Sequence, residues 1–508
     1  MNVAFDPWIP VVTLEGKPKL ASLSEVLTRG NVLADLSVRP HERVSLMRLF
    51  LCVAHASLDG PKDYDEWREV PARLPDAAKK YLEKWRESFE LFHSTKPWLQ
   101  IPELIPAKNA GKELFIASSK LDFALATGSN TTLFDHQGTS KERNLTPAQL
   151  ALGLVSIQNF STCGTLGRPI WRGKATADSA TDAPCIPSSM YHALLIGDSL
   201  MRSICLNLCA YDEMAPLWGA LWKDDAIGRP IWEQMPVSQA DSKSCSTYLG
   251  RLVPLSRAIR LQPDGSQMLY GEGLRYPVFP LFPRECTASE GVTSGKAKQD
   301  RYLVGAKPDV RPWRQLDAIL QYHRNNQTAG TSGAISLSHA GDDEDVDIWV
   351  GALIRNSGKQ DILDSQESRF HVPAKLRSQE GCRNYGECVL QASQIERTLN
   401  DAIWKYRIAL DPMDETGLGS TGAKHYWTAV EENLALLTSH IEALGTNSAV
   451  PTRDAWRSML RRCSRDAYQA ACGQETPRQI KAFVEGWKKL NYVPTEPKKK
   501  SKRKGAKE

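Results

Sequence analysis

The chain has 508 residues, of which 41% are hydrophobic and 24% are charged. This length accommodates roughly two or three domains with cores of their own, and the composition is ordinary for a globular protein. No apolar run approaches the roughly 20 residues that a membrane-spanning helix needs, and the N-terminus carries no basic and apolar leader. We therefore expect a cytoplasmic protein with no membrane partner. The eleven cysteines are scattered and lack the paired spacing of a zinc site, which predicts reduced and buried thiols.

The net charge of +5 is concentrated at the C-terminus, because seven basic and two acidic residues follow Pro494 and the rest of the chain sums to zero. A protein that wraps nucleic acid on its own is usually basic throughout its fold. Any contact with nucleic acid is therefore expected at a few points or within a larger assembly. Residues 494–508 have no apolar periodicity, so we expect a disordered basic tail.

The N-terminal part begins with a predicted pair of strands. Gly16-Lys17-Pro18 is typical of a turn, which predicts strands over Val11–Leu14 and Pro18–Leu20. A helical region is expected to follow from Ser22 to Leu36.

A second hairpin is predicted near the middle of the chain. The turn Pro263-Asp264-Gly265-Ser266 separates Arg251–Leu261 from Gln267–Tyr270. Two segments rich in Gly, Ser and Thr, Thr287–Lys298 and Thr328–Ser338, are expected to be surface loops. Strands mixed with helices in this way predict an α+β domain over residues 1–377.

The C-terminal part changes to long amphipathic segments. Apolar residues recur at intervals of 3 and 4 in four places, which predicts helices that each bury one face. The members of these stripes are Ile395, Leu399, Ile403 and Tyr406; Trp427, Val430, Leu434, Leu437, Ile441 and Leu444; Trp456, Leu460, Cys463 and Ala467; and Ile480, Phe483, Trp487 and Leu490. Short connections between the segments favour an antiparallel four-helix bundle over residues 378–493.

One group of acidic residues would suit a metal-dependent nuclease. Asp342, Asp343, Glu344 and Asp345, joined by Asp135 and His136, could gather metal ions for phosphodiester cleavage. The acidic run follows a Gly/Ser loop and no matching motif accompanies it, so a solvated acidic loop is the favoured interpretation. We accordingly predict no catalytic residue, no metal and no cofactor, and keep the nuclease as the alternative function.

Two loops suit recognition better than catalysis. Gly164-Thr165-Leu166-Gly167-Arg168 lets a backbone approach another molecule closely, because glycine has no Cβ. Arg355–Gln360 is a polar turn between the apolar segment Ile348–Ile354 and Ile362-Leu363. The residues alone leave open that both are ordinary surface loops.

Four groups of residues are more distinctive than any of these elements. They are Phe5-Asp6-Pro7-Trp8-Ile9-Pro10-Val11; Phe89-Glu90-Leu91-Phe92 with Lys96-Pro97-Trp98-Leu99-Gln100; Gly128-Ser129-Asn130-Thr131-Thr132-Leu133-Phe134-Asp135-His136; and Arg355-Asn356-Ser357-Gly358-Lys359-Gln360-Asp361-Ile362-Leu363. In this order and spacing the chain resembles the large-subunit (CasA) family of the type I-E CRISPR surveillance complex, Cascade.

The resemblance implies a non-catalytic role in antiviral defence. Members of this family read the protospacer-adjacent motif (PAM) of double-stranded target DNA and wedge its strands apart, so that the guide RNA can pair and form an R-loop. The implied partners are that DNA, the 5′ handle of the guide RNA, the other Cascade subunits and a helicase-nuclease that is recruited afterwards.

The resemblance also implies three groups of site residues. The PAM-proximal loop would contain Phe134, Asp135, His136, Gln137, Lys141 and Arg143; the glycine loop Gly164, Thr165 and Gly167; and the wedge with its minor-groove readers Asn356, Ser357, Gly358, Lys359 and Gln360. The family's Asn-Gln-Ala turn is replaced by Gly358-Lys359-Gln360, so the wedge residue is either Lys359 or Gln360. Gln267–Tyr270 lacks the family's minor-groove lysine, for which Arg275 is a possible substitute.

Overall fold

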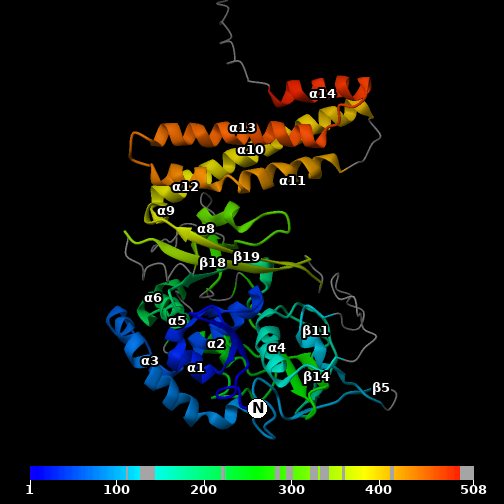
Figure 1. The fold of residues 1–508 in the computed structure, drawn as a ribbon. Helices are drawn as coiled ribbons and strands as arrows, with labels where there is room; N and C mark the ends of the chain where they lie inside the picture. The colour runs from blue at the N-terminus through cyan, green and yellow to red at the C-terminus, as the bar shows by residue number, and fades with distance from the viewer. Residues whose placement is uncertain are drawn as a thin grey trace, which may run out of the picture. The chain divides into compact units, whose positions relative to one another are not determined.

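A computed structural model of the chain describes residues 1–109, 112–125, 143–218, 222–223, 225–279, 281, 287–292, 301–320, 330–331, 343–356, 361–411 and 417–491. The chain divides into two compact units, Met1–Arg377 and Ser378–Glu508. Figure 1 traces the first unit from blue to yellow-green and the second from yellow to red. The first mixes helices with several small sheets, and the second is helical in its described residues, so the predicted α+β class is confirmed.

The first unit opens with a sheet of order β2-β1-β3, formed by β1 (Ile9–Thr13), β2 (Pro18–Ala21) and β3 (Leu33–Leu36). The predicted strand pair is therefore correct. The predicted helix from Ser22 to Leu36 is wrong in its second half, because α1 (Leu23–Arg29) gives way to the 3-10 turn η1 (Gly30–Val32) and then to β3. Pairing of Leu36 with Val11 of β1 outweighs the helical periodicity.

The centre of the first unit is α2 (Pro40–Leu58), most of whose residues are buried. It contacts α3, α4, α7 and β18. The helices of this unit after α2 are α3 (Tyr64–Lys84), α4 (Pro147–Phe160), α5 (Leu200–Asn207), α6 (Tyr211–Trp218), α7 (Tyr248–Leu252), α8 (Leu316–Leu320) and α9 (Ala374–Arg377). Five short 3-10 turns lie between these helices in the described part of the sequence: η2 (Arg86–Phe89), η3 (Ser118–Leu121), η4 (Pro187–Ser189), η6 (Lys243–Ser246) and η7 (Pro312–Gln315).

Two antiparallel sheets carry the predicted hairpins. One has the order β12-β18-β19, from β12 (His192–Ile196), β18 (Val346–Arg355) and β19 (Ile362–Val372). The other has the order β13-β14-β7, from β13 (Arg257–Leu261), β14 (Gln267–Glu272) and β7 (Ile116–Ala117). The predicted central hairpin is thus confirmed, with Gly265 at a φ of 73° in its turn. Its first strand starts later than predicted, because Arg251 and Leu252 end α7.

A third sheet corrects the predicted surface loops. It has the order β16-β15-β17, from β15 (Ser289–Val292), β16 (Arg301–Leu303) and β17 (Gly330–Thr331). Thr287, Ser289 and Glu290 are buried, so the predicted loop is wrong at its start, where β15 is the central strand of the sheet. The remaining short strands are β4 (Leu104–Ile105), β5 (Lys108–Asn109), β6 (Lys112–Glu113), β8 (Gly164–Thr165), β9 (Ile170–Trp171), β10 (Lys174–Ala175) and β11 (Ser179–Ala180).

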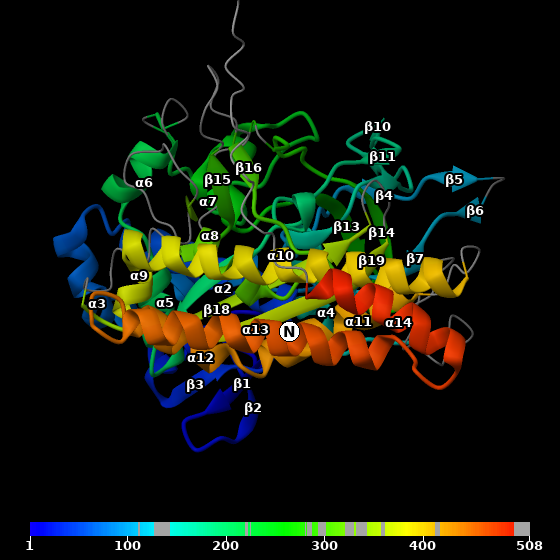
Figure 2. The same ribbon diagram turned by 90° about the horizontal axis from the view of Figure 1, so that it is seen from above.

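The second unit is a helical bundle made of α10 (Gln379–Leu410), α11 (Leu418–Glu431), α12 (Leu434–Glu442), α13 (Ala449–Ala471) and α14 (Pro477–Leu490). The predicted helix through Trp427 and Leu444 is interrupted at Glu432 and Asn433, so α11 and α12 together take one place and both lie against α13 (Figures 1 and 2). The stripe through Leu460 is buried as predicted, and so is the stripe through Leu399 except for Ile395, which is half-buried. Ile480 is not a core residue, because 50% of it is exposed.

The described residues agree with the composition. No helix among them is long and apolar enough to cross a membrane. Ten of the eleven cysteines are described, and each is a free thiol; nine are buried and Cys163 is half-buried.

Two histidines of the first unit, His41 and His55, are buried. Burial lowers the pKa of both His41 and His55 from 6.5 to about 4. His55 bonds to the carbonyl oxygen of Gly60 at 2.8 Å through Nδ1. The His41 ring lies edge-on to Phe123 and Phe160, and neither of its nitrogens has a hydrogen-bond partner among the described residues.

We predict that acidification destabilises the fold between pH 6.5 and pH 4. Between these pH values the histidines of the unfolded chain bind protons, whereas His41 and His55 in the folded chain do not. Their contribution to the free energy of unfolding is therefore complete above pH 6.5 and is lost as the pH falls. From pH 7 to pH 5 the loss should be about 2 kcal/mol for each histidine. Urea unfolding at several pH values measures it. His41→Phe, which keeps a ring against Phe123 and Phe160, should make the dependence shallower, and an unchanged slope would contradict the assignment.

Candidate nucleic-acid interface

The glycine loop lies backbone to backbone against neighbouring strands. Gly164-Thr165 is β8, which pairs with β11 so that Gly164 faces Ala180. The φ of Gly164 is 147°, a conformation that L side chains rarely adopt. At Gly167 an added Cβ would lie 3.1 Å from the carbonyl oxygen of Tyr270 in β14. The predicted glycine loop is therefore a shaped edge, with Thr165 and Gly167 exposed.

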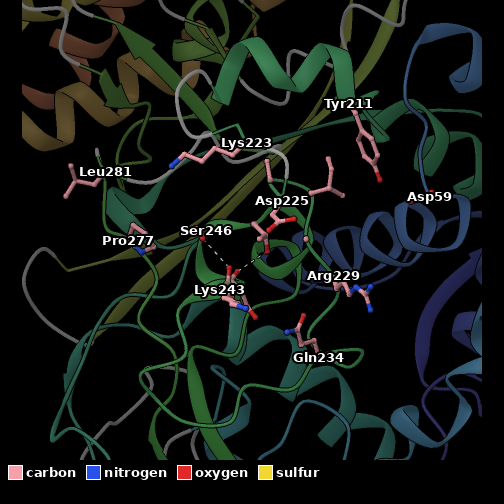
Figure 3. A pocket seen from close by; sticks show the side chains of 15 residues that line it. Asp59, Tyr211, Lys223, Asp225, Arg229, Gln234, Lys243, Ser246, Pro277 and Leu281 are labelled. Atoms are coloured by element: carbon pink, nitrogen blue, oxygen red, sulfur yellow. Dashed lines mark hydrogen bonds between the residues drawn. The ribbon is translucent and has the colours of Figure 1, made fainter.

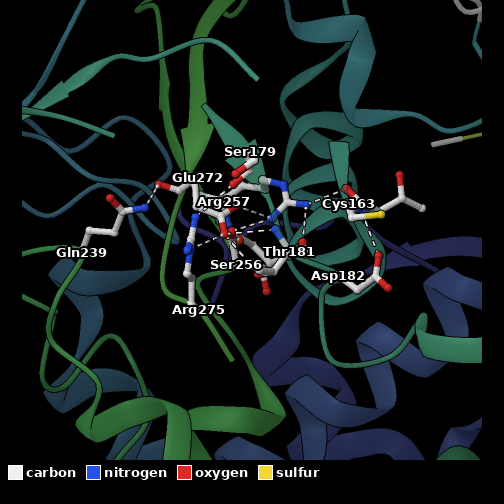
Figure 4. Close-up of polar contacts among 11 residues, drawn as sticks. Cys163, Ser179, Thr181, Asp182, Gln239, Ser256, Arg257, Glu272 and Arg275 are labelled. Carbon is white, nitrogen blue, oxygen red and sulfur yellow. Dashed lines mark hydrogen bonds and ion pairs between the residues drawn. The ribbon is translucent and has the colours of Figure 1, made fainter. Parts of the chain in front are cut away.

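A buried ion pair stands behind this edge (Figure 4). Arg257 Nη1 lies 3.2 Å from Glu272 Oε2 across the β13–β14 pair, and neither side chain has any exposed surface. The Nη2 atom of Arg257 donates to the carbonyl oxygens of Thr162 at 2.8 Å and Thr181 at 2.9 Å. Thr162 precedes the glycine loop and Thr181 follows β11, and because Gly164 pairs with Ala180, one guanidinium holds both strands of the β8–β11 pair at the same end.

Glu272 completes this network from the other strand. Its Oε1 atom accepts hydrogen bonds from Thr181 N at 3.1 Å and Thr181 Oγ1 at 3.0 Å. Burial raises the pKa of the Glu272 carboxyl group, while Arg257 opposes this rise. Because each charge is matched by polar partners, the network satisfies the main requirement for burying ions in a protein.

Arg275, the possible substitute for the family's lysine, lies at the rim of the same network. Its Nε atom is 3.4 Å from Glu272 Oε1, and Nη2 donates to the carbonyl oxygen of Ser179 in β11 at 3.2 Å. Half of the side chain, 51%, is exposed. The head of Arg275 is therefore positioned beside the glycine loop and remains open to solvent.

The predicted polar turn is the tip of the β18–β19 hairpin. Arg355 pairs with Ile362, and Asn356 N donates to the carbonyl oxygen of Asp361 at 3.0 Å, which closes the turn. The two strands predicted on either side of this segment are confirmed, and Arg355 is itself the last residue of β18. Ser357, Gly358, Lys359 and Gln360 lie outside the described residues.

Asp182 joins this hairpin to the glycine loop. Its Oδ1 atom accepts a hydrogen bond from Cys163 N at 2.8 Å and also forms an ion pair with Arg355 Nη1. The backbone N of Arg355 donates to Ser189 Oγ at 3.1 Å. Two predicted recognition elements that are far apart in the sequence thus meet at one carboxylate.

Most of the predicted PAM-proximal loop is not described. Phe134, Asp135, His136, Gln137 and Lys141 lie outside the described residues, whereas Arg143 is half-buried shortly before α4. Upstream of this loop, Asp122 forms an ion pair with Arg39, the residue that caps α2.

A basic hairpin next to the glycine loop escaped the sequence analysis. Strands β9 and β10 are joined by Arg172 and Gly173, whose φ values of 47° and 80° are those of a tight turn. Arg168, Arg172 and Lys174 are exposed, and Arg172 pairs with Glu103 at 3.1 Å. The sequence signal that could have revealed this hairpin is the dipeptide Arg172-Gly173, which is suited to the tight turn between β9 and β10.

The acidic run gives no support to the nuclease alternative. Asp345 accepts a hydrogen bond from Ala374 N, and both Asp345 and Asp347 lie near His371. The pKa of His371 is raised chiefly by the hydrogen bond that its ring donates to Asp347. No group of three or more potential ligands suited to a metal ion occurs among the described residues. Asp342, Asp135 and His136 lie outside them, whereas Asp343 and Glu344 are exposed.

The first unit also contains an open cavity of about 630 Å³ (Figure 3). Its lining carries both signs of charge, from Lys223, Arg229 and Lys243 and from Asp59 and Asp225. None of the predicted site residues lines it.

Comparisons with known proteins agree with one another. The family model of the CRISPR-associated protein Cse1 matches residues 2–467. The chain is 27% identical to the CRISPR-associated protein CasA/Cse1 of Thermus thermophilus, over 96% of this chain and 95% of that protein. Crystal structures of CasA from Thermus thermophilus and of Cse1 from Thermobifida fusca have the same fold, with TM-scores of 0.75 and 0.73, identities of 22% and 20%, and coverage of 96% of this chain and 98% of each of those chains.

A third structure has a similar fold. It is a chain of a "CRISPR RNA-guided surveillance complex", with a TM-score of 0.72, 20% identity and coverage of 96% of this chain and 99% of that chain.

We predict that Glu272→Gln destabilises the first unit strongly, because it leaves the Arg257 guanidinium buried without a counter-charge. Removing one partner of a buried ion pair typically costs about 3–5 kcal/mol. Chemical denaturation measures the difference. Asp347→Asn is the matched control, since it removes a charge from the half-exposed pair with Arg369 and should cost less than about 1 kcal/mol. Equal effects of the two variants would mean that the buried pair does not support the fold.

Proposed function

Because the chain belongs to the Cse1 family of CRISPR-associated proteins, we propose that it is the large subunit of a type I-E Cascade complex that reads the PAM and opens the target duplex. The observation that carries this proposal is the contact between the glycine loop and the β18–β19 hairpin through Asp182. Its partners would be double-stranded target DNA, the 5′ handle of the guide RNA and the other Cascade subunits. It would act in the cytoplasm in antiviral defence.

The glycine loop is suited to reading a minor groove. Gly164 and Gly167 carry no side chain, so their backbone can approach base edges closely. The minor groove distinguishes A·T from G·C pairs but little else, which suits a sensor of short and tolerant motifs. Arg275, exposed beside β11, can supply the cation that the family places in this groove.

The β18–β19 hairpin is suited to opening the duplex. The hydrogen bond from Asn356 N to the carbonyl oxygen of Asp361 closes its base on both sides of the segment that contains Lys359 and Gln360. The exchange of a DNA duplex for an RNA–DNA hybrid is nearly balanced, so a wedge need only assist the first base pairs. The exposed cations Arg168 and Lys174 can hold nearby phosphates without a strongly basic fold.

We propose that this subunit cuts no nucleic acid itself and that cleavage belongs to a recruited helicase-nuclease. The engagement of Asp345 and Asp347 with His371 and Arg369 supports this division of labour. Incubation of the purified chain with plasmid and Mg²⁺ or Mn²⁺ tests it, and metal-dependent cutting that copurifies with the chain would refute it.

We predict that Gly164→Ala impairs PAM reading. A β-carbon at a φ of 147° strains the backbone by on the order of 1–3 kcal/mol and moves the edge that faces the groove. Binding of the reconstituted complex to targets with and without the PAM should lose about tenfold in discrimination. Gly173→Ala is the matched control, because Gly173 has a φ of 80° and open space but lies in the neighbouring hairpin. Equal losses in both variants would show that strain anywhere in this region is sufficient.

We predict that the double change Lys359→Ala and Gln360→Ala slows strand opening. An inserted side chain offsets part of the few kcal/mol that unstacking costs. R-loop formation should slow on an intact duplex and remain nearly normal on a target with a melted bubble beside the PAM. Equal impairment on both targets would mean that these residues bind DNA without opening it.

A further inference from the structure

We propose that Asp182 is a positioning residue that couples PAM reading by the glycine loop to strand opening by the β18–β19 hairpin. The inference rests on the proposed function of these two elements. It concerns a side chain to which the sequence analysis assigned no role, and it predicts that reading and opening depend on one shared contact.

The geometry places one oxygen between the two elements. Asp182 Oδ1 accepts the backbone N–H of Cys163, the residue directly before Gly164, at 2.8 Å. The same oxygen pairs with the guanidinium of Arg355, which lies directly before Asn356. Only 17% of the Asp182 side chain and 13% of the Arg355 side chain are exposed, so water competes weakly for these contacts.

On the hairpin side of the contact between Asp182 and Arg355, the backbone of Arg355 is held in place. The backbone N of Arg355 donates to the hydroxyl of Ser189 at 3.1 Å, and Arg355 is the last residue of β18. If DNA in the glycine loop shifts the Cys163 backbone, that shift would displace Asp182 and strain its ion pair with Arg355. The displacement would then pass to Asn356, which directly follows Arg355. Hydrogen bonds to a charged oxygen are stronger than neutral ones, which makes this link a competent transmitter.

The backbone around Asp182 is held by other groups. Thr181 bonds to Arg257 and Glu272, and Ala183 N donates to the carbonyl oxygen of Ser161 at 2.8 Å. Replacing Asp182 alone leaves the largely buried Arg355 charge without its partner, which costs stability, whereas replacing both residues removes both charges and should preserve the fold. A functional defect that persists in the double variant is therefore not a defect of folding.

The test uses the reconstituted complex and measures R-loop formation on four DNA targets, with and without the PAM, intact or with a bubble beside it. On intact duplex, the PAM should speed up R-loop formation. Asp182→Ala and Arg355→Gln should each reduce the ratio of the rates with and without the PAM about tenfold, which is within the range typical of coupled sites. The double variant should be no worse than either single variant, because all three break one link. Bubble targets should be affected little.

Conservative variants separate coupling from simple packing. Asp182→Asn keeps an oxygen for Cys163 N but loses the charge facing Arg355, so its defect should be intermediate, and Arg355→Lys should restore part of the loss. Asp347→Asn, which alters an ion pair at the other end of the same hairpin, should leave R-loop formation unchanged. The double variant Asp182→Ala with Arg355→Gln leaves neither charge unpaired, so its complex should melt at the temperature of the unaltered complex while its R-loop formation stays slow.

The outcomes separate this inference from the function on which it rests. If the unaltered complex forms R-loops regardless of the PAM, the proposed function fails. If its R-loops depend on the PAM but the Asp182 and Arg355 variants behave normally, only the coupling fails. Additive losses in the double variant, or a drop in its melting temperature that parallels the loss of rate, would likewise overturn the coupling.

Discussion

The buried pair of Arg257 and Glu272 is the interaction around which the proposed recognition surface is built. Buried ions persist in a protein when their charges are matched and most of their hydrogen-bonding groups have partners, and this pair binds Thr162 and Thr181, with only the Nε atom of Arg257 unpartnered among its nitrogens in the described residues. The same hydrogen bonds and ion pair hold the glycine loop, β11 and the β13–β14 hairpin together. A loop with glycine at both Gly164 and Gly167 has few side chains with which to pack, so the polar network next to it fixes its shape.

This arrangement also reconciles a nearly neutral body with the proposed contacts to DNA. Positive charge at the proposed interface is local and comes from Arg275, Arg168 and Lys174, and Arg275 and Arg168 also bind neighbouring groups of the protein. Few phosphates need to be neutralised when a larger complex retains the DNA and the guide RNA supplies sequence specificity. Backbone and a small number of cations are then sufficient for a degenerate minor-groove signal.

Local signals predicted the elements whose cause is local. The Pro-Asp-Gly-Ser turn specified the central hairpin, and intervals of 3 and 4 specified the helices of the second unit. The register of that hairpin even places Arg257 opposite Glu272, so this pair was accessible from sequence once the turn was known. The predictions were wrong for β3 and β15, because these segments are strands only through pairing with residues that are distant in the sequence. The prediction for Ile480 was wrong for another reason: periodicity indicates an apolar stripe but does not show whether other residues cover it.

The contact between Asp182 and Arg355 belongs to a class that no local pattern reveals. An aspartate in a polar segment and an arginine at the end of a strand are common, and only the fold brings them together across 173 positions. Family resemblance indicates the two proposed recognition elements but does not indicate what joins them. If the chain reads one feature of DNA and acts on another, as we propose, the two elements need a connection. A carboxylate is well suited to that role, because it can accept hydrogen bonds from a backbone amide and a guanidinium at once.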